Sequence, residues 1–388
     1  MGHTAARQPI RIAVDGRSLN RAHVRGIGRY LLRILQAPPR PDEAPLRWTV
    51  YGDRPDLPVW IESSEHVDVK IFECRGDRFQ AWEQLALPAN ARRSSDVLFC
   101  PGVTGPAWQP IPTVIAVHDI IPWLMEDESM PAGFYRDRVL PRAYASAAAL
   151  VAPSQSSVHD IVARWPSLQP RLHMIPLGVD ETFLTAQPGP LPDSIVAAHI
   201  KRPYLLYVGG EIPRKRLDWA LDVWRDATAF TVHFVACGVN AHAQDAIRER
   251  LPPESRSMIY FANYLPDSEM PALYMNAAAV LYPTMYEGFG FPAVEAQACG
   301  TPVLFSAVGS LAELAGPGAA VLPADDKAAW VAACRRLIQE RAVAPPRPND
   351  SAREWAAQFS WRSTADRQID VLAAVANRRQ PAPLERAR

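Results

Sequence analysis

Short apolar runs of strand length recur along the chain, and amphipathic segments of helical length separate them. In the first half the runs lie at residues 10–14, 48–51, 67–72, 97–99, 113–117, 150–152 and 172–175. The amphipathic segments between them include residues 81–91, 134–147 and 156–163. Strands that alternate with helices in this way predict an open, mostly parallel α/β sheet.

The same pattern restarts after a segment rich in proline and glycine at residues 178–203. A second set of strands is predicted at residues 204–208, 232–236, 258–261, 278–282, 303–306 and 320–322, and helices at 351–358 and 363–376 follow. We therefore predict two α/β domains of similar size. Ligands of such sheets bind beyond the carboxyl ends of the strands, so two of them facing one another would place an active site in the cleft between them.

Composition argues against several kinds of partner and site. Lysine plus arginine equals aspartate plus glutamate at 41 residues each, so we expect no nucleic-acid partner. No apolar run reaches the roughly 18 residues that span a bilayer, and the N-terminus lacks a signal-peptide core, so we expect a cytoplasmic protein. The five cysteines are scattered and predict neither a disulfide framework nor a zinc site.

Residues 277–303 predict a strand, a glycine loop and a short helix in succession. Gly288 and Gly290 bracket the loop, and backbone N–H groups at a helix start attract anions. Glu287 lies on the loop and Glu295 one turn into the helix. Two carboxylates around such donors suit a nucleotide sugar, which offers hydroxyls at two places and a diphosphate between them. Alternatively, the negative charge of Glu295 only stabilises the start of its helix, and the Glu287 side chain is simply exposed to solvent. The pattern leaves both interpretations open.

A similar unit opens the chain. The strand at residues 10–14 is followed by Asp15-Gly16 and then by Gly26-Ile27-Gly28 before a helix. The third glycine of a dinucleotide fingerprint would fall at Leu31, so that motif is excluded. Close approach of the Gly28 backbone to a ligand and a plain helix start are both compatible with this spacing.

The later unit contains Tyr286-Glu287-Gly288-Phe289-Gly290-Phe291-Pro292, Glu295-Ala296 and Cys299-Gly300-Thr301-Pro302-Val303. These motifs closely resemble the donor-site signature of the family 4 retaining glycosyltransferases, also called group 1, which have the two-domain GT-B fold. Similar residues follow the family's order over about residues 10–340: Asp15-Gly16-Arg17, Gly26-Ile27-Gly28-Arg29-Tyr30, Trp82-Glu83-Gln84, Val117-His118-Asp119, Ala152-Pro153-Ser154, Tyr207-Val208-Gly209, Pro213-Arg214-Lys215, Asn263-Tyr264-Leu265 and Val308-Gly309-Ser310.

The resemblance implies two Rossmann-like domains whose mostly parallel sheets face one another across a cleft. The acceptor-side domain would span residues 1–185 and be joined by the C-terminal helix at about 360–378. The donor-binding domain would span residues 186–359. We expect the arginine- and proline-rich tail at 379–388 to be disordered.

The resemblance also implies roles for individual residues. Glu287 would contact the transferred sugar, and Glu295 would accept hydrogen bonds from the ribose hydroxyls. Arg214 and Lys215 would neutralise the charge of the diphosphate. The alternative is a basic turn that is exposed to solvent. The rarity of lysine, which accounts for four of the 41 basic residues, argues against this alternative. The residues assigned to donor binding are Gly28, Gly209, Arg214, Lys215, Gly288, Phe289, Gly290, Phe291 and Glu295. Those assigned to catalysis are Glu287, His118, Arg214 and Lys215.

Two of these assignments concern the first domain. His118 follows a strand at its carboxyl end, where it would contact the donor sugar or serve a structural role. Gly28 would approach the diphosphate when the cleft closes.

No Asp-x-Asp motif occurs in the chain, so we expect neither a metal nor another cofactor. Arg214, Lys215 and the helix start would supply the positive charge that a divalent ion supplies elsewhere. Family members retain the anomeric configuration, most often by front-face substitution, and a covalent intermediate on Glu287 is the older alternative.

The expected reaction moves a hexose, with mannose or rhamnose favoured, from a nucleotide sugar to a saccharide acceptor. A GDP-sugar donor and a lipid-linked acceptor are favoured. The reaction would then belong to the synthesis of a bacterial surface polysaccharide such as lipopolysaccharide. The alternatives are a non-catalytic nucleotide-sugar-binding protein and a sugar-nucleotide epimerase on the same fold.

Peripheral contact with the inner face of the plasma membrane is a further hypothesis. Arg25, Arg29 and Arg33 lie at helical spacing, and Arg136, Arg138 and Arg142 add basic character to a later helix. These arginines could meet anionic headgroups, and a solvated helix face is the alternative.

Overall fold

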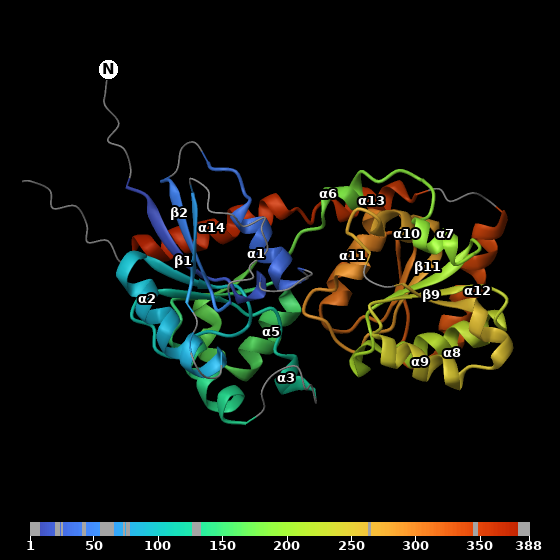
Figure 1. Ribbon diagram of the computed structural model, residues 1–388, viewed down its shortest axis with the longest axis horizontal. Helices are drawn as coiled ribbons and strands as arrows, with labels where there is room; N and C mark the ends of the chain where they lie inside the picture. Colours follow the sequence, from blue (N-terminus) through green and yellow to red (C-terminus); the bar gives the residue numbers. More distant parts are fainter. Residues whose placement is uncertain are drawn as a thin grey trace, which may run out of the picture. The chain divides into compact units, whose positions relative to one another are not determined.

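The computed structural model divides the chain into two compact units, Met1–Leu177 with Trp361–Arg388, and Gly178–Ser360 (Figure 1). The structure describes residues 8–19, 24, 26–40, 44–54, 66–72, 74, 78–125, 133–262, 265–343 and 348–378. The tail at 379–388, Arg25 and Asn263-Tyr264 lie outside the described residues. The units separate between Leu177 and Gly178, whereas the sequence predicted a boundary after residue 185.

The first unit is built on a parallel seven-stranded sheet in the order β3-β2-β1-β4-β5-β6-β7. Pairing of β1 with β2 on one side and β4 on the other reverses the direction in which strands are added. The strands are β1 (Ile10–Asp15), β2 (Leu46–Gly52), β3 (Val67–Ile71), β4 (Val97–Cys100), β5 (Thr113–Ala116), β6 (Ala149–Ala152) and β7 (Leu172–Met174). Each apolar run that predicted a strand in this half forms one.

Helices cover both faces of this sheet. α1 (Ile27–Leu35) packs against the C-terminal helix α14 (Trp361–Asn377), and α2 (Leu87–Ser94) covers the opposite face (Figure 1). The other helical segments are η1 (Arg17–Leu19), η3 (Arg78–Ala86), α3 (Ile121–Leu124), η4 (Tyr135–Val139), α4 (Leu140–Ser146), α5 (Gln155–Arg164) and η5 (Pro166–Arg171).

Two segments predicted as uniform amphipathic helices change geometry along their length. η3 and η4 are π-helical, and each runs directly into an α-helix, α2 or α4. Pro88 and Pro141 are the second residues of those α-helices. Because proline donates no N–H, it interrupts the hydrogen-bond ladder at the point where the spacing changes.

The second unit has a parallel six-stranded sheet in the order β10-β9-β8-β11-β12-β13. Its strands are β8 (Tyr204–Val208), β9 (Phe234–Cys237), β10 (Ile259–Ala262), β11 (Ala277–Tyr282), β12 (Val303–Phe305) and β13 (Ala319–Val321). The strand order reverses again, here between β8 and β11. Ligands of open parallel sheets bind beyond the carboxyl ends of the strands at such a reversal.

Helices α8 (Leu217–Thr228) and α12 (Lys327–Val343) pack together on this sheet, and α10 (Met270–Asn276), α11 (Phe291–Ala298) and α13 (Asp350–Ala356) form a second group. α9 (Ala241–Arg250) and the short helices η6 (Pro213–Lys215), η7 (Pro253–Met258) and η8 (Gly309–Leu314) complete the unit. The predicted linker at 178–203 belongs to this unit and contains α6 (Glu181–Leu184) and α7 (Asp193–Ala197). Phe183 and Ile195 are buried and anchor these turns, a contribution that proline and glycine content does not reveal.

Candidate active site

The turn after β8 carries the two predicted diphosphate cations. Tyr207 shapes it, because the single proton of its hydroxyl faces two carbonyl oxygens, that of Gly210 at 2.9 Å and that of Lys215 at 3.2 Å. A Cβ on Gly209 would lie 2.6 Å from that hydroxyl oxygen, so a side chain at this position would displace the tyrosine. The loop after β11 is tied to the same turn, since the Met285 N–H donates to the Arg214 carbonyl at 2.7 Å.

Glu287 is the centre of this arrangement. Arg214 Nη1 donates to Glu287 Oε1 at 2.9 Å, and Lys215 Nζ lies 3.6 Å from the same oxygen. Thr284 Oγ1 donates to it at 3.1 Å. Glu287 is 8% exposed, and the side chains of Arg214 and Lys215 are 17% exposed. A solvated glutamate and a solvated basic turn are therefore wrong interpretations of these residues.

The surroundings of Glu287 favour its ionised form. Burial alone would raise the pKa of this carboxyl group. Lys215 and Arg214, together with hydrogen bonds from Tyr282 and Arg214, outweigh burial and lower the pKa below its usual value. The carboxylate of Glu287 is therefore held in its charged form beside Arg214 and Lys215.

Glu295 and the phenylalanines of the glycine loop lie in the same unit. Glu295 is buried on α11, and its Oε2 accepts a hydrogen bond of 2.9 Å from the Tyr274 hydroxyl. Gly290 has a φ of 102° and begins this helix. Phe289 packs edge-on against Phe291 and Phe359, with ring centroids 5.3 and 5.8 Å away. Ligand contacts of Gly288, Phe289, Gly290, Phe291 and Glu295 stay predictions.

His118 and Gly28 belong to the first unit, whereas the other predicted site residues belong to the second. A Cβ on Gly28 would lie 2.7 Å from the Ser18 carbonyl oxygen, so glycine permits close approach to the chain's own backbone. His118 Nε2 lies 2.8 Å from the Pro101 carbonyl oxygen. Since a carbonyl only accepts, the proton is assigned to Nε2. The ring also packs edge-on against Tyr30, with centroids 5.1 Å apart.

His118 is expected to stay uncharged between pH 6 and 8, because burial lowers its pKa to about 4, although the bond to Pro101 raises it. A histidine whose pKa is lowered on folding contributes full stability above the unfolded value of about 6.5, and this contribution is lost as pH falls towards 4. NMR of imidazole-labelled protein, assigned with the His118→Gln variant, measures the titration. A midpoint near 6.5 would contradict the burial argument.

Sequence reasoning gave no role to Ser310 or Gly309, although both lie in a motif that resembles the family. The N–H of Ser310 donates to the Glu287 carbonyl at 3.1 Å. The single proton of its Oγ faces two carbonyl oxygens, that of Phe289 at 2.6 Å and that of Glu287 at 3.0 Å. Thr284 was likewise missed. Ser310 therefore fixes the backbone of the Glu287 loop, and Thr284 fixes the carboxylate itself.

Gly309→Ala is expected to destabilise the protein by about 1–3 kcal/mol. Gly309 has a φ of 53°, and an added Cβ would lie 2.7 Å from the Glu287 carbonyl oxygen. Urea denaturation measures the change. Gly189→Ala is the control, because its Cβ would meet nothing nearer than 3.7 Å and its φ is not in the left-handed region. Equal stability of the two variants would contradict the prediction.

Within the described ranges, no group of three or more histidine, cysteine, aspartate or glutamate side chains is placed to hold a metal ion. Metal independence stays a prediction. No helix in the part of the chain that the structure describes is long and apolar enough to cross a membrane.

Comparison with known proteins decides the family. A family model described as Glycosyltransferase Family 4 matches residues 24–183, and one described as Glycosyl transferases group 1 matches residues 202–340. The chain belongs to the group 1, family 4 glycosyltransferases. The glycosyltransferase family predicted from the motifs is thus confirmed.

Two relatives illustrate this glycosyltransferase's similarities. It is 31% identical over 175 residues to O-antigen chain mannosyltransferase B of Escherichia coli, covering 43% of this chain and 45% of the relative. It is 28% identical over 281 residues to the MMP alpha-(1->4)-mannosyltransferase of Mycolicibacterium hassiacum, covering 67% of this chain and 64% of the relative. The chain therefore spans about half to two thirds of the length of these relatives.

Solved structures confirm the predicted GT-B fold. Anabaena Alr3699/HepE in complex with UDP and glucose matches with a TM-score of 0.72 and 17% identity, over 94% of this chain and all of that one. WaaG, a glycosyltransferase involved in lipopolysaccharide biosynthesis, matches with a TM-score of 0.66 and 16% identity, over 94% of this chain and 99% of that one.

Proposed function

We propose that this glycosyltransferase moves a hexose from a nucleotide sugar to a saccharide acceptor. The observation that carries the proposal is the cluster of Arg214, Lys215 and Glu287 beyond the carboxyl ends of β8 and β11. One carboxylate and two cations leave a single positive charge, so the cluster suits an anionic ligand. The donor-binding role thus falls to the second unit and the acceptor to the first.

Both cations lie against the same oxygen of Glu287, so a bound diphosphate would compete with that oxygen for their N–H groups. We propose that the diphosphate takes over these donors and that the released carboxylate then accepts hydrogen bonds from the sugar hydroxyls. Charge grows on the nucleoside diphosphate as the glycosidic bond breaks. The fixed cations therefore stabilise the transition state more than the ground state.

The proposed reaction retains the anomeric configuration and needs no metal. The acceptor oxygen bonds to the anomeric carbon on the face from which the phosphate oxygen departs. The acceptor proton passes to that phosphate oxygen, so protons and charge balance without a protein base. Arg214 and Lys215 supply the charge that a divalent ion supplies in other transferases.

For the sugar, the proposal favours mannose or rhamnose carried by GDP, and for the acceptor a lipid-linked saccharide of a bacterial surface polysaccharide. Support comes from the similarity to O-antigen chain mannosyltransferases of Escherichia coli and Salmonella typhimurium. UDP is the competing nucleotide, because Anabaena HepE was solved with UDP and glucose.

A thermal-shift screen of GDP-mannose, dTDP-rhamnose and UDP-glucose in EDTA tests the donor, and a transfer assay over a panel of saccharides tests turnover. We expect one nucleotide sugar to stabilise the protein and to be consumed with retention. Binding without turnover would instead support a non-catalytic binding protein. Release of nucleoside diphosphate with formation of an altered free sugar, equally fast without acceptor, would support an epimerase.

Contact with an anionic membrane stays a prediction. Arg136 pairs with Asp137 at 2.8 Å, and Arg142 Nη1 donates to the Arg138 carbonyl at 3.0 Å, so these arginines have partners within the protein. The neighbouring Phe134 is 74% exposed, which would suit an interface with lipid. Sedimentation with anionic vesicles at low and high salt tests the contact, and equal recovery in the supernatant with and without vesicles would refute it.

A further inference from the structure

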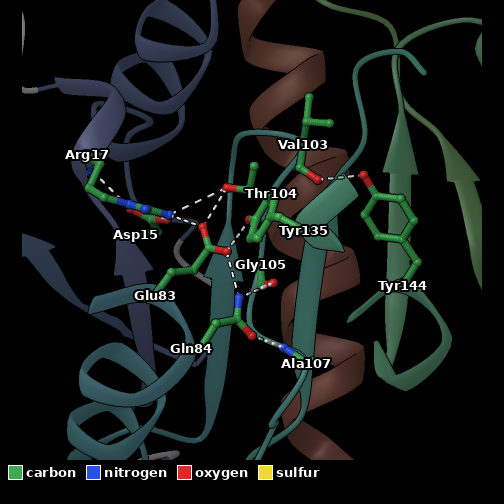
Figure 2. A network of polar contacts seen from close by, with 10 residues as sticks. All are labelled: Asp15, Arg17, Glu83, Gln84, Val103, Thr104, Gly105, Ala107, Tyr135 and Tyr144. Carbon is green, nitrogen blue, oxygen red and sulfur yellow. Dashed lines mark hydrogen bonds and ion pairs between the residues drawn. The ribbon is translucent and has the colours of Figure 1, made fainter. Parts of the chain in front are cut away.

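A buried charged network lies where the strand order of the first unit reverses (Figure 2). Asp15 ends β1, Arg17 follows in η1, and Glu83 lies on η3. Arg17 is 7% exposed and Glu83 is fully buried. The network therefore occupies the carboxyl end of β1, beside the loop that follows β4.

Arg17 joins the two acidic residues. Its Nε lies 2.9 Å from Asp15 Oδ1, and its Nη2 lies 2.5 Å from Asp15 Oδ2 and also donates to Glu83 Oε2. The guanidinium carbon lies 4.7 Å from the centre of the Trp82 ring. Two carboxylates face one cation, and apolar side chains can replace buried ion pairs without loss of stability. Stability alone therefore does not account for this network.

Glu83 gathers donors from four side chains. Its Oε1 accepts from the Tyr135 hydroxyl at 2.5 Å and from Gln84 Nε2 at 2.9 Å. Its Oε2 accepts from Arg17 and, at 2.7 Å, from Thr104 Oγ1. Glu83 and Tyr135 both lie on π-helical segments, which are rare and often occur at functional sites.

The network holds the loop of residues 101–107, which follows β4. Thr104 bonds to Glu83, while Gln84 Nε2 donates to the Gly105 carbonyl at 3.2 Å and Gln84 Oε1 accepts from the Ala107 N–H at 2.8 Å. Figure 2 shows these contacts together with the 2.7 Å bond from the Tyr144 hydroxyl to the Val103 carbonyl. The loop is therefore fixed at several of its residues.

We propose that Glu83 is a positioning residue of the saccharide-acceptor site, which it serves by holding the 101–107 loop at the carboxyl ends of β1 and β4. The inference rests on the proposed function, which gives the reversal point of the second sheet to the donor. The corresponding point of the first sheet is then the place for the acceptor, since open parallel sheets bind ligands there. Glu83 acts through Thr104 and Gln84 and does not touch the reacting atoms.

Glu83→Gln tests this role without changing the size of the side chain. A glutamine offers one accepting oxygen and one nitrogen that only donates. That nitrogen must face either Arg17, which cannot accept, or Gln84. If it faces Gln84, the side-chain amide of Gln84 must rotate by half a turn to offer its oxygen, and Gln84 then loses its hydrogen bonds to Gly105 and Ala107. Thr104→Val is the second variant, because it removes the loop's own bond to Glu83 and keeps the shape of the side chain.

We expect both variants to raise the KM for the acceptor by about tenfold or more, as misplaced binding groups do. Slow hydrolysis of the nucleotide sugar without acceptor should stay within about twofold, because the donor residues are untouched. Amide hydrogen exchange at residues 101–107 should rise in both variants without substrate.

Asp96→Asn is the matched control. Asp96 pairs with Arg11 at 2.7 Å and lies next to β4 at the opposite ends of the same two strands. It should change neither acceptor KM nor exchange of the loop. The inference would be overturned if Glu83→Gln and Thr104→Val left either the hydrogen exchange of the loop or the acceptor KM unchanged. It would also be overturned if both variants lowered the melting temperature and reduced hydrolysis and transfer to the same extent, since that pattern indicates a general folding defect. Absence of both hydrolysis and transfer in the wild type would refute the proposed function instead, while the exchange measurement still tests the loop.

Discussion

Glu287→Gln is expected to lower kcat for sugar transfer by at least about 100-fold. The substitution keeps the shape of the side chain and removes the negative charge that Glu287 presents to Arg214 and Lys215. In the proposed reaction that charge lies beside a sugar that becomes oxocarbenium-like, so its loss weakens the transition state more than the bound substrate. The donor Kd should change much less than kcat. Initial-rate kinetics and thermal-shift titration with the nucleotide sugar measure the two quantities.

Glu254→Gln is the control for this prediction, because Glu254 is an exposed glutamate of the same unit. It should leave kcat unchanged. Circular dichroism separates a catalytic from a folding defect. If folded Glu287→Gln protein kept more than about a tenth of the wild-type kcat, the carboxylate would not stabilise the transition state in the way proposed.

Much of the fold could be predicted from the sequence because its signals are local. The apolar run before Pro283 forms β11, and Glu287, Gly288 and Gly290 lie on the loop that follows it. Strand order could not be read in this way, because a buried strand looks the same at every position of a parallel sheet. The π-helical turns were also missed, since amphipathic spacing does not distinguish them from an α-helix.

The candidate site was predictable where one short motif contains it, and less so where distant residues meet. Arg214 and Glu287 are 73 positions apart, and the family resemblance brought them together. Arg17 and Glu83, 66 positions apart, lie in motifs that resemble the family but received no role. Local periodicity does not indicate which charged residues of separate segments will share a buried network. Asp15 at the end of a buried strand, with Arg17 two residues later, was the available signal, and nothing comparable marked Glu83.

In each unit a cluster of charged side chains lies at the point where the strand order reverses, and the two clusters have net charges of opposite sign. Beyond β8 and β11, Arg214, Lys215 and Glu287 leave one positive charge. Beyond β1 and β4, Asp15, Arg17 and Glu83 leave one negative charge when both carboxyl groups are ionised. Under the proposed function this difference suits the two substrates, because the donor carries a diphosphate and the acceptor presents neutral hydroxyls. A second positively charged site would draw the diphosphate of the donor to the wrong unit, whereas a negatively charged one repels it.

Lys215→Met is expected to lower kcat/KM by about 100-fold and to move the acid limb of its pH profile to higher pH. Lys215 is a major cause of the lowered pKa of Glu287, so its removal raises that pKa. In the wild type, the stability gained from this pairing is present above the usual glutamate pKa of about 4.3 and is lost as pH falls through the lower, folded value. The difference in stability between wild type and variant should therefore be largest near neutral pH and shrink as pH falls below 4.

Lys201→Met, at an exposed lysine of the same unit, should leave the profile and the rate unchanged. Profiles of kcat/KM between pH 4 and 8 measure both the fall in rate and the displacement of the acid limb. Urea denaturation at pH 4 and at pH 8 measures the difference in stability between wild type and variant. A fall in rate with no displacement of the acid limb would mean that Lys215 acts on the diphosphate alone. A displacement with no fall in rate would mean that it sets the charge of Glu287 without assisting the leaving group. The arrangement of both cations on one carboxylate oxygen predicts that the two effects occur together.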